Sequence, residues 1–226
     1  MRVKKMVAAV VASMALTAVV ANAAHAAWFI EGKELGAALQ EDVKYAAMTP
    51  FTLSGNPIGA VKITAQKVEC AAGATCSIDG ANFGTDHSTA KLTFTEVTVD
   101  EPANCSVAGG AFTTTALTDE VIMDPKGGLS TFDKFFPEVP TTIAEIEFVG
   151  ALCPIAGVVA PLKGTITAEM QRTTTAIALQ ALDFGAAEQA TGEGKLTWGK
   201  PEATLAGEAT MSLSGGNVGK IFSATE

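Results

Sequence analysis

The chain has 226 residues, of which 48% are hydrophobic, 6% aromatic and 17% charged, and its formal net charge at pH 7 is −9. This acidic balance offers no attractive surface to the phosphate backbone of nucleic acids, and anionic membranes would repel it as well. We therefore expect no nucleic-acid partner and interpret the acidity as an aid to solubility in an extracellular fluid.

Residues 1–26 have the pattern of a cleavable signal peptide. A short basic segment precedes a largely apolar run over residues 6–21, and Ala24 and Ala26 match the small-x-small cleavage site. The apolar run is shorter than the about 20 residues that a membrane-spanning helix needs, which favours cleavage over an uncleaved anchor. We predict cleavage after Ala26 and a soluble, exported domain over residues 27–226 with no membrane span, located in the periplasm, the cell wall or the medium.

The exported part has the composition of an all-β protein. Threonine, valine and isoleucine recur in short runs, and the 22 glycines and 9 prolines of the chain interrupt these runs. We predict one domain, an antiparallel meander that forms a β-sandwich or a flattened β-barrel. A short N-terminal helix over residues 33–47, which are rich in alanine and leucine, is the expected exception.

Alternation of apolar and polar residues is clearest over residues 61–70 and 92–99. In the second segment Glu96 falls on the face of Leu92 and Phe94, so the alternation does not decide which face is buried. We expect further strands over residues 112–117, 120–123, 143–148, 165–173, 177–184, 194–198 and 203–213. In the last of these, small residues at Gly207 and Ala209 predict a thin inner face.

All four cysteines, Cys70, Cys76, Cys105 and Cys153, lie in the exported part. An even number in an oxidising compartment indicates two disulfides, and the spacing required for a zinc site is absent. Sequence alone leaves the pairing open. If residues 75–83 and 91–99 form a hairpin, however, Cys76 comes to lie a few residues from Cys105. We therefore favour Cys76–Cys105 and Cys70–Cys153.

The loop between these segments holds the residues closest to a functional pattern. Residues 79–86 combine aspartate, asparagine and glycine but lack the ligand spacing of a calcium loop, so a tight turn is the better interpretation. His87 is the only histidine left after cleavage, and no nucleophile-elbow motif accompanies it. We interpret His87 as a solvated turn residue.

Carboxylate pairs are frequent in this acidic chain but do not single out a catalytic site. Two carboxyl groups must face each other across a cleft to hydrolyse a glycoside, and adjacent residues on a strand point to opposite faces. No phosphate-binding glycine motif opens a helix. We predict no catalytic, cofactor-binding or metal site. The pairs considered are Glu41–Asp42, Asp100–Glu101, Asp119–Glu120 and Glu145/Glu147.

The aromatic residues are expected to serve packing. Phe132, Phe135 and Phe136 lie close together in the sequence, and Pro137 should bar this segment from a central strand, so we predict a hydrophobic plug on the end of a sheet or barrel. Trp28 and Trp198 are predicted to be core or sheet-edge residues.

The start of the exported part, residues 28–32 (Trp-Phe-Ile-Glu-Gly), resembles a group of uncharacterised secreted bacterial proteins, best represented in actinobacteria, whose mature chains open with a Trp-aromatic-aliphatic-x-Gly motif. Residues 68–70, 92–95, 102–107 and 150–153 follow in the order that this group shows. Its members often carry a cysteine at the position of Glu96, opposite Cys76 in the hairpin above, which supports the Cys76–Cys105 pairing. The resemblance implies secretion and an all-β fold, and no function.

Three functions are compatible with these observations. The first is an exported, non-catalytic protein of the cell envelope or extracellular space, with an envelope component as partner. The second is a β-barrel carrier of a small apolar ligand, because a meander of this length can close around one ligand and the small residues at Gly207 and Ala209 would leave room. The third is a secreted hydrolase with carboxylate chemistry.

Overall fold

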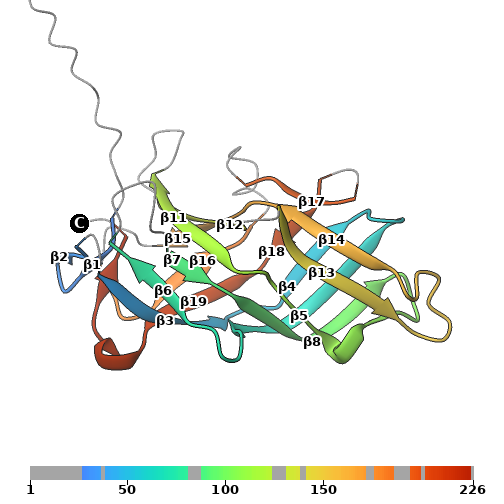
Figure 1. Cartoon of the computed structure of the whole chain (residues 1–226), viewed down its shortest axis with the longest axis horizontal. Helices are drawn as coiled ribbons and strands as arrows, with labels where there is room; N and C mark the ends of the chain where they lie inside the picture. The colour runs from blue at the N-terminus through green and yellow to red at the C-terminus, as the bar shows by residue number, and fades with distance from the viewer. Residues whose placement is uncertain are drawn as a thin grey trace, which may run out of the picture.

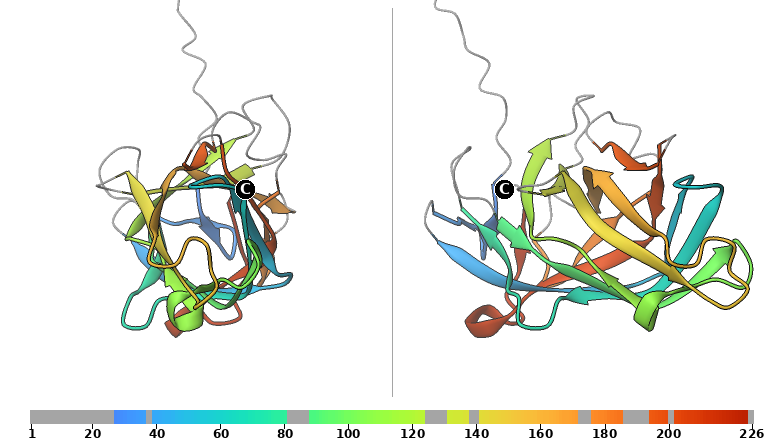
Figure 2. Two further views of the ribbon diagram at one scale, coloured as in Figure 1. Left: turned by 90° about the vertical axis from the view of Figure 1, so that its right-hand side faces the viewer. Right: turned by 45° about the vertical axis from the view of Figure 1, so that its right-hand side comes forward.

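The computed structural model describes residues 27–36, 39–80, 88–123, 131–137, 141–171, 176–185, 194–199 and 202–224. Eight strand paths follow one another in chain order and pair antiparallel to form one elongated barrel (Figure 1). Each path consists of two consecutive strands, one in each half, and in the path of β10 and β11 the short strand β9 comes first. The view along the barrel in Figure 2 shows the strands arranged as a ring. The predicted single all-β domain with antiparallel meander topology is confirmed, in the form of a barrel.

One half of the barrel, which we call the capped half, is a single eight-stranded sheet in the order β6-β3-β19-β16-β15-β12-β11-β7. The edge strands β6 and β7 lie side by side, with Ser77 Oγ 3.4 Å from Thr89 Oγ1, so the sheet is nearly closed. Its strands are β3 (Gln40–Ala47), β6 (Cys76–Asp79), β7 (Ser88–Ala90), β11 (Leu117–Met123), β12 (Thr131–Pro137), β15 (Ile166–Gln171), β16 (Gln180–Asp183) and β19 (Glu208–Leu213).

The other half, which we call the loop half, continues the same eight paths. It contains the sheets β10-β8-β5-β4-β18 and β17-β14-β13-β9, which the isolated bridges Thr114–Ala144 and Thr197–Glu202 connect. Its strands are β4 (Phe51–Gly55), β5 (Val61–Cys70), β8 (Leu92–Glu101), β9 (Ser106–Val107), β10 (Ala111–Thr113), β13 (Thr142–Val149), β14 (Val159–Gly164), β17 (Leu196–Trp198) and β18 (Thr204–Ala206), with the 3-10 helix η1 (Ala108–Gly110).

A small fourth sheet closes the end of the capped half. It pairs β1 (Phe29–Ile30) with β2 (Lys33–Glu34) and with β20 (Phe222–Ser223), close to the 3-10 helix η2 (Gly215–Asn217). Trp28 and Phe222 are buried there with ring centroids 6.0 Å apart. The first and last described segments of the chain therefore form the cap together.

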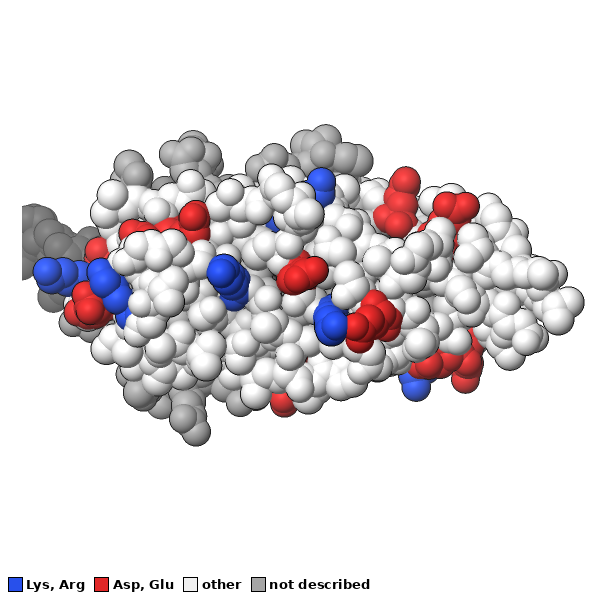
Figure 3. All heavy atoms as spheres, turned by 90° about the horizontal axis from the view of Figure 1, so that it is seen from below, with Lys and Arg blue, Asp and Glu red and all other residues white. Residues whose placement is uncertain are grey.

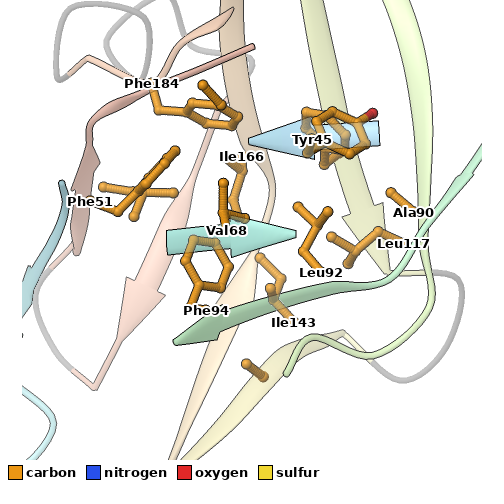
Figure 4. Packing of buried hydrophobic residues seen from close by; sticks show 14 of the residues in the cluster. Tyr45, Phe51, Val68, Ala90, Leu92, Phe94, Leu117, Ile143, Ile166 and Phe184 are labelled. Carbon is orange, nitrogen blue, oxygen red and sulfur yellow. The ribbon is translucent and has the colours of Figure 1, made fainter. Parts of the chain in front are cut away.

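A continuous line of aromatic rings fills the barrel from one half to the other. Phe94 stacks on Phe112 at 4.8 Å and meets Phe51 edge to face at 5.5 Å. The line continues through Phe184 and Phe135 to Tyr45, with neighbouring centroids 5.3, 6.2 and 6.3 Å apart, and Figure 4 shows four of its rings, Tyr45, Phe51, Phe94 and Phe184. Aromatic pairs at these separations add stability beyond the area they bury.

Two predictions about local structure are wrong. Within the range expected to be helical, Lys33–Glu34 form β2 and Gln40–Ala47 form β3, because Val43 and Tyr45 alternate with exposed residues and face the core with a period of two. Residues 132–137 belong to β12, a central strand between β11 and β15, and do not form a plug. Pro137 is tolerated because it is the last residue of that strand.

The inner face of β8, which sequence left open, changes partway along the strand. Leu92 and Phe94 point inward, and the buried position then passes to Val97. Glu96 between them has a left-handed backbone with φ 54°, which shifts the alternation and brings the Glu96 carboxylate outward to pair with Lys67.

Candidate functional site

Two carboxyl groups and a phenol lie together inside the capped half. The inward positions of β11 are Leu117, Asp119 and Val121, and Asp133 occupies an inward position of β12. Asp119 pairs with Phe135, and Val121 pairs with Asp133, so the two acids are diagonal neighbours on one face. Both are buried. We call Asp119, Asp133 and Tyr45 the acid cluster.

The surroundings of the acid cluster favour the uncharged forms of Asp133 and Tyr45. Burial, the charge of Asp119 and a hydrogen bond to Asp119 together raise the pKa of Asp133 well above its ordinary value. Burial also raises the pKa of the Tyr45 hydroxyl, with smaller contributions from Asp133 and Asp119. Two carboxyl groups this close in a dry interior cannot both ionise at low cost.

This arrangement gives a large substrate no access to the acid cluster. A glycosidase needs its two carboxyl groups on opposite sides of an open cleft, about 5 to 10 Å apart. Here the two carboxyl groups are within hydrogen-bonding distance of each other and face the packed barrel interior. The chemistry available to the acid cluster is therefore proton uptake and release, not polysaccharide hydrolysis.

The opposite end of the molecule has a different character. Residues 55–60, 102–110 and 150–158, which we call the loop end, connect strands at the far end of the loop half and contain no charged residue. Leu152 is 79% exposed, Ile58 52% and the adjoining Val159 50%. The space-filling view in Figure 3 shows this right-hand end without a charged side chain.

A shallow groove of about 380 Å³ opens on the outside of the barrel, where β10 and β13 diverge. Threonines line most of it, and Lys91 and Glu145 supply charges of opposite sign. The hydroxyls of Thr114 and Thr115 already bond the backbone of Leu92 and Thr142. The groove therefore offers few free polar groups to a ligand.

The four cysteines form two disulfides, as predicted, but the favoured pairing is wrong. The bonds are Cys70–Cys76 and Cys105–Cys153. The expected hairpin does not form, because β6 pairs with β3 while β8 pairs with β5 and β10. Cys70 and Cys76 instead flank the interruption of one strand path, and Cys105–Cys153 joins two segments of the loop end.

The other residues considered from sequence are dispersed. Residues 81–87, which include His87 and most of the calcium-like segment, lie outside the described residues. Glu145 and Glu147 are both exposed on β13. Of the Asp119–Glu120 pair only Asp119 is buried, as alternation predicts, and Trp28 and Trp198 are confirmed as packing residues.

The space for a ligand that was expected beside Gly207 is occupied by Phe51. A Cβ at Gly207 would lie 2.9 Å from the Phe51 ring, so the missing side chain makes space for Phe51 and not for a ligand. Sequence reasoning also missed Asp133. Asp133 lies two residues before the buried Phe135 and so occupies the same face of β12, which could have revealed it. Pro137, however, had led us to predict that this segment is not a central strand.

Within the described ranges, no group of three or more histidine, cysteine or acidic side chains is placed to hold a metal ion. Over the same part of the chain, no helix has the length and apolar character needed to cross a membrane. Comparisons with protein-family models, with curated proteins and with solved structures gave no match.

Proposed function

We propose that this chain is an exported, non-catalytic protein of the cell envelope or extracellular space. The observation that carries the proposal is the contrast between the interior and the surface. The acid cluster, the most reactive group of side chains described, is enclosed in a packed barrel, whereas the loop end presents exposed apolar side chains. A molecule built in this way acts through its surface.

The two disulfides support the proposed location outside the cytoplasm. Structural disulfides persist outside the cytoplasm, in the bacterial periplasm or the medium, and here each one ties down an irregular segment of the barrel. The signal-peptide pattern of residues 1–26 gives the route of export.

Export is tested by fractionating the producing cells and measuring the intact mass of the protein before and after reduction. We expect a chain that starts at Ala27, is found outside the cytoplasm, and gains two hydrogens per disulfide on reduction. A full-length chain with reduced cysteines in the cytoplasm would overturn the proposal.

The non-catalytic part is tested by a screen of esters, glycosides and peptides, with the exported protein and its His87→Ala variant assayed in parallel. We expect no turnover above the buffer blank from either protein. Hydrolysis by the wild type that His87→Ala abolishes would replace this function with that of a secreted hydrolase.

The barrel topology favours a second candidate, a carrier of a small apolar ligand, because an eight-stranded barrel can hold one such ligand. The aromatic line through the described interior argues against it. Native mass spectrometry of protein isolated from its producing cells decides between the two. A stoichiometric apolar adduct supports the carrier, and a bare protein supports the surface-acting protein.

A further inference from the structure

The two ends of the barrel differ in how charge accompanies their exposed apolar residues. At the cap, Val218 and Ile221 are exposed beside Lys220 and Glu31, whose side chains form an ion pair at 3.7 Å. At the loop end, Leu152 and Ile58 are exposed on segments without a charge, and the exposed Val159 adjoins them at the start of β14, opposite Glu147. The three segments of the loop end together carry no charged residue.

Residues 150–158 of the loop end pair four of their amides with backbone carbonyls. Within residues 150–158, the amides of Cys153, Ala156 and Val158 donate to carbonyls three residues earlier, at 3.1 to 3.2 Å. The Gly157 amide donates to the Phe148 carbonyl at 2.8 Å, and Cys153 is tied to Cys105. Backbone groups paired in this way can leave water without losing hydrogen bonds, which a hydrocarbon environment demands.

We propose that the loop end docks on the surface of an electrically neutral lipid bilayer, with Leu152, Ile58 and Val159 entering the boundary between headgroups and acyl chains. This inference goes beyond the proposed function by naming the partner, and it relies on that function only for removal of the apolar residues 6–21.

A lipid surface suits the loop end better than a protein does. A stable protein interface needs about 800 Å² from each partner with matched shapes, and even large aromatic side chains bury only about 150 to 250 Å² each, so three aliphatic ones fall short. A bilayer requires no shape match and accepts a tapering tip, which is the form of the right-hand end in Figure 3.

The charges behind the loop end select the type of lipid. Glu101 at the end of β8 and Glu147 on β13 are exposed where the charge-free segments give way to strands. Their carboxylates would face the headgroups and would be repelled by anionic lipid. We therefore expect binding to zwitterionic vesicles that is insensitive to salt and weakened by anionic lipid.

The test is flotation of the exported protein with phosphatidylcholine vesicles, comparing wild type with Leu152→Asp and with Val218→Asp. Val218 is the matched control because it is 68% exposed but lies at the cap. We expect wild type and Val218→Asp to float with the vesicles, and Leu152→Asp to lose at least tenfold in apparent partitioning. Both positions are exposed, so equal urea midpoints should verify that the variants fold.

Three results would overturn the inference: wild type that stays at the bottom of the gradient, equal binding by the two variants, or binding that strengthens as anionic lipid is added. Each differs from failure of the proposed function, which would appear beforehand as unprocessed protein inside the cell.

Discussion

Asp133 is a carboxyl group whose titration is coupled to folding. Its pKa is raised in the folded state, by burial first and then by Asp119, from an ordinary value of 3.8. Between that value and the raised one, the folded state binds more protons than the unfolded state. The stability that this group contributes is therefore fully present below about pH 4 and is lost as the pH rises, by up to about 1.4 kcal/mol per pH unit.

We predict that Asp133→Asn removes this slope. The groups that face Asp133 are Asp119 on β11 and Tyr45 on β3, and the variant leaves both in place. Urea unfolding from pH 4 to 8 should show wild type losing stability relative to Asp133→Asn as the pH rises. Glu120→Gln on the outer face of β11 is the control and should keep the wild-type slope. Parallel curves for wild type and Asp133→Asn would contradict the prediction.

Sequence reasoning predicted which face of its strand Asp119 occupies, but it did not predict that Asp133 would be its neighbour. Alternation along one strand correctly placed Asp119 and Glu120 on opposite faces, because a period of two is a local property. The meeting of Asp119 with Asp133 depends on the register between β11 and β12. Register is set by the whole barrel, and no local pattern in this chain reports it.

At the scale of elements, Gly207 marks the point where one strand path passes from β18 to β19. We predict that Gly207→Ala costs about 1 to 3 kcal/mol, because the added methyl group would lie 2.9 Å from the Phe51 ring and φ is 151°. Gly216→Ala, where a Cβ meets nothing within 4 Å, is the control and should change little.

A double-mutant cycle with Phe51→Leu identifies why Gly207→Ala is destabilising. If the ring clash dominates, the cost of Gly207→Ala should fall when the ring is removed, measured by urea unfolding of all four proteins. An unchanged cost would assign the effect to backbone strain alone.

The two disulfides close loops of very different length, with sequence separations of 48 and 6 residues. In the chain-entropy picture, removing Cys105–Cys153 should cost about 4 kcal/mol and removing Cys70–Cys76 about 2 kcal/mol. Paired serine substitutions and urea unfolding measure both. Equal losses would show that the longer loop is already restricted in the unfolded chain.

The same disulfides show where prediction from sequence ends. Oxidation of all four cysteines followed from their even number and the export signal. Their pairing required knowing that β6 and β8 are not partners, and the turn-rich segment between them gave a false hairpin. The strand over residues 61–70 and the all-β class were predictable because alternation and composition are local, whereas the choice between sandwich and barrel stayed open. The interruption of each path was not predictable, because the point where a path leaves one sheet for another depends on pairing with strands distant in the sequence.

At the scale of the whole molecule, the eight strand paths bind the two halves of the barrel into one cooperative unit. Every path contributes a strand to each half, and the aromatic line crosses between them. Neither half can lose its sheet without opening strands that continue into the other. A domain with such shared elements is expected to unfold in one all-or-none transition.

The two tryptophans allow this cooperativity to be measured, because Trp28 lies buried in the cap and Trp198 lies buried on β17 in the loop half. Trp198→Phe leaves Trp28 as the single reporter, and Trp28→Phe leaves Trp198. In each variant, tryptophan fluorescence and far-ultraviolet circular dichroism should follow the same urea transition. A fluorescence change of Trp28 that precedes the loss of strand signal would mean that the cap opens first. The small sheet of β1, β2 and β20 would then be a separate, weaker unit, attached to the barrel through the bridge between Phe222 and Ile177, which lies just before β16.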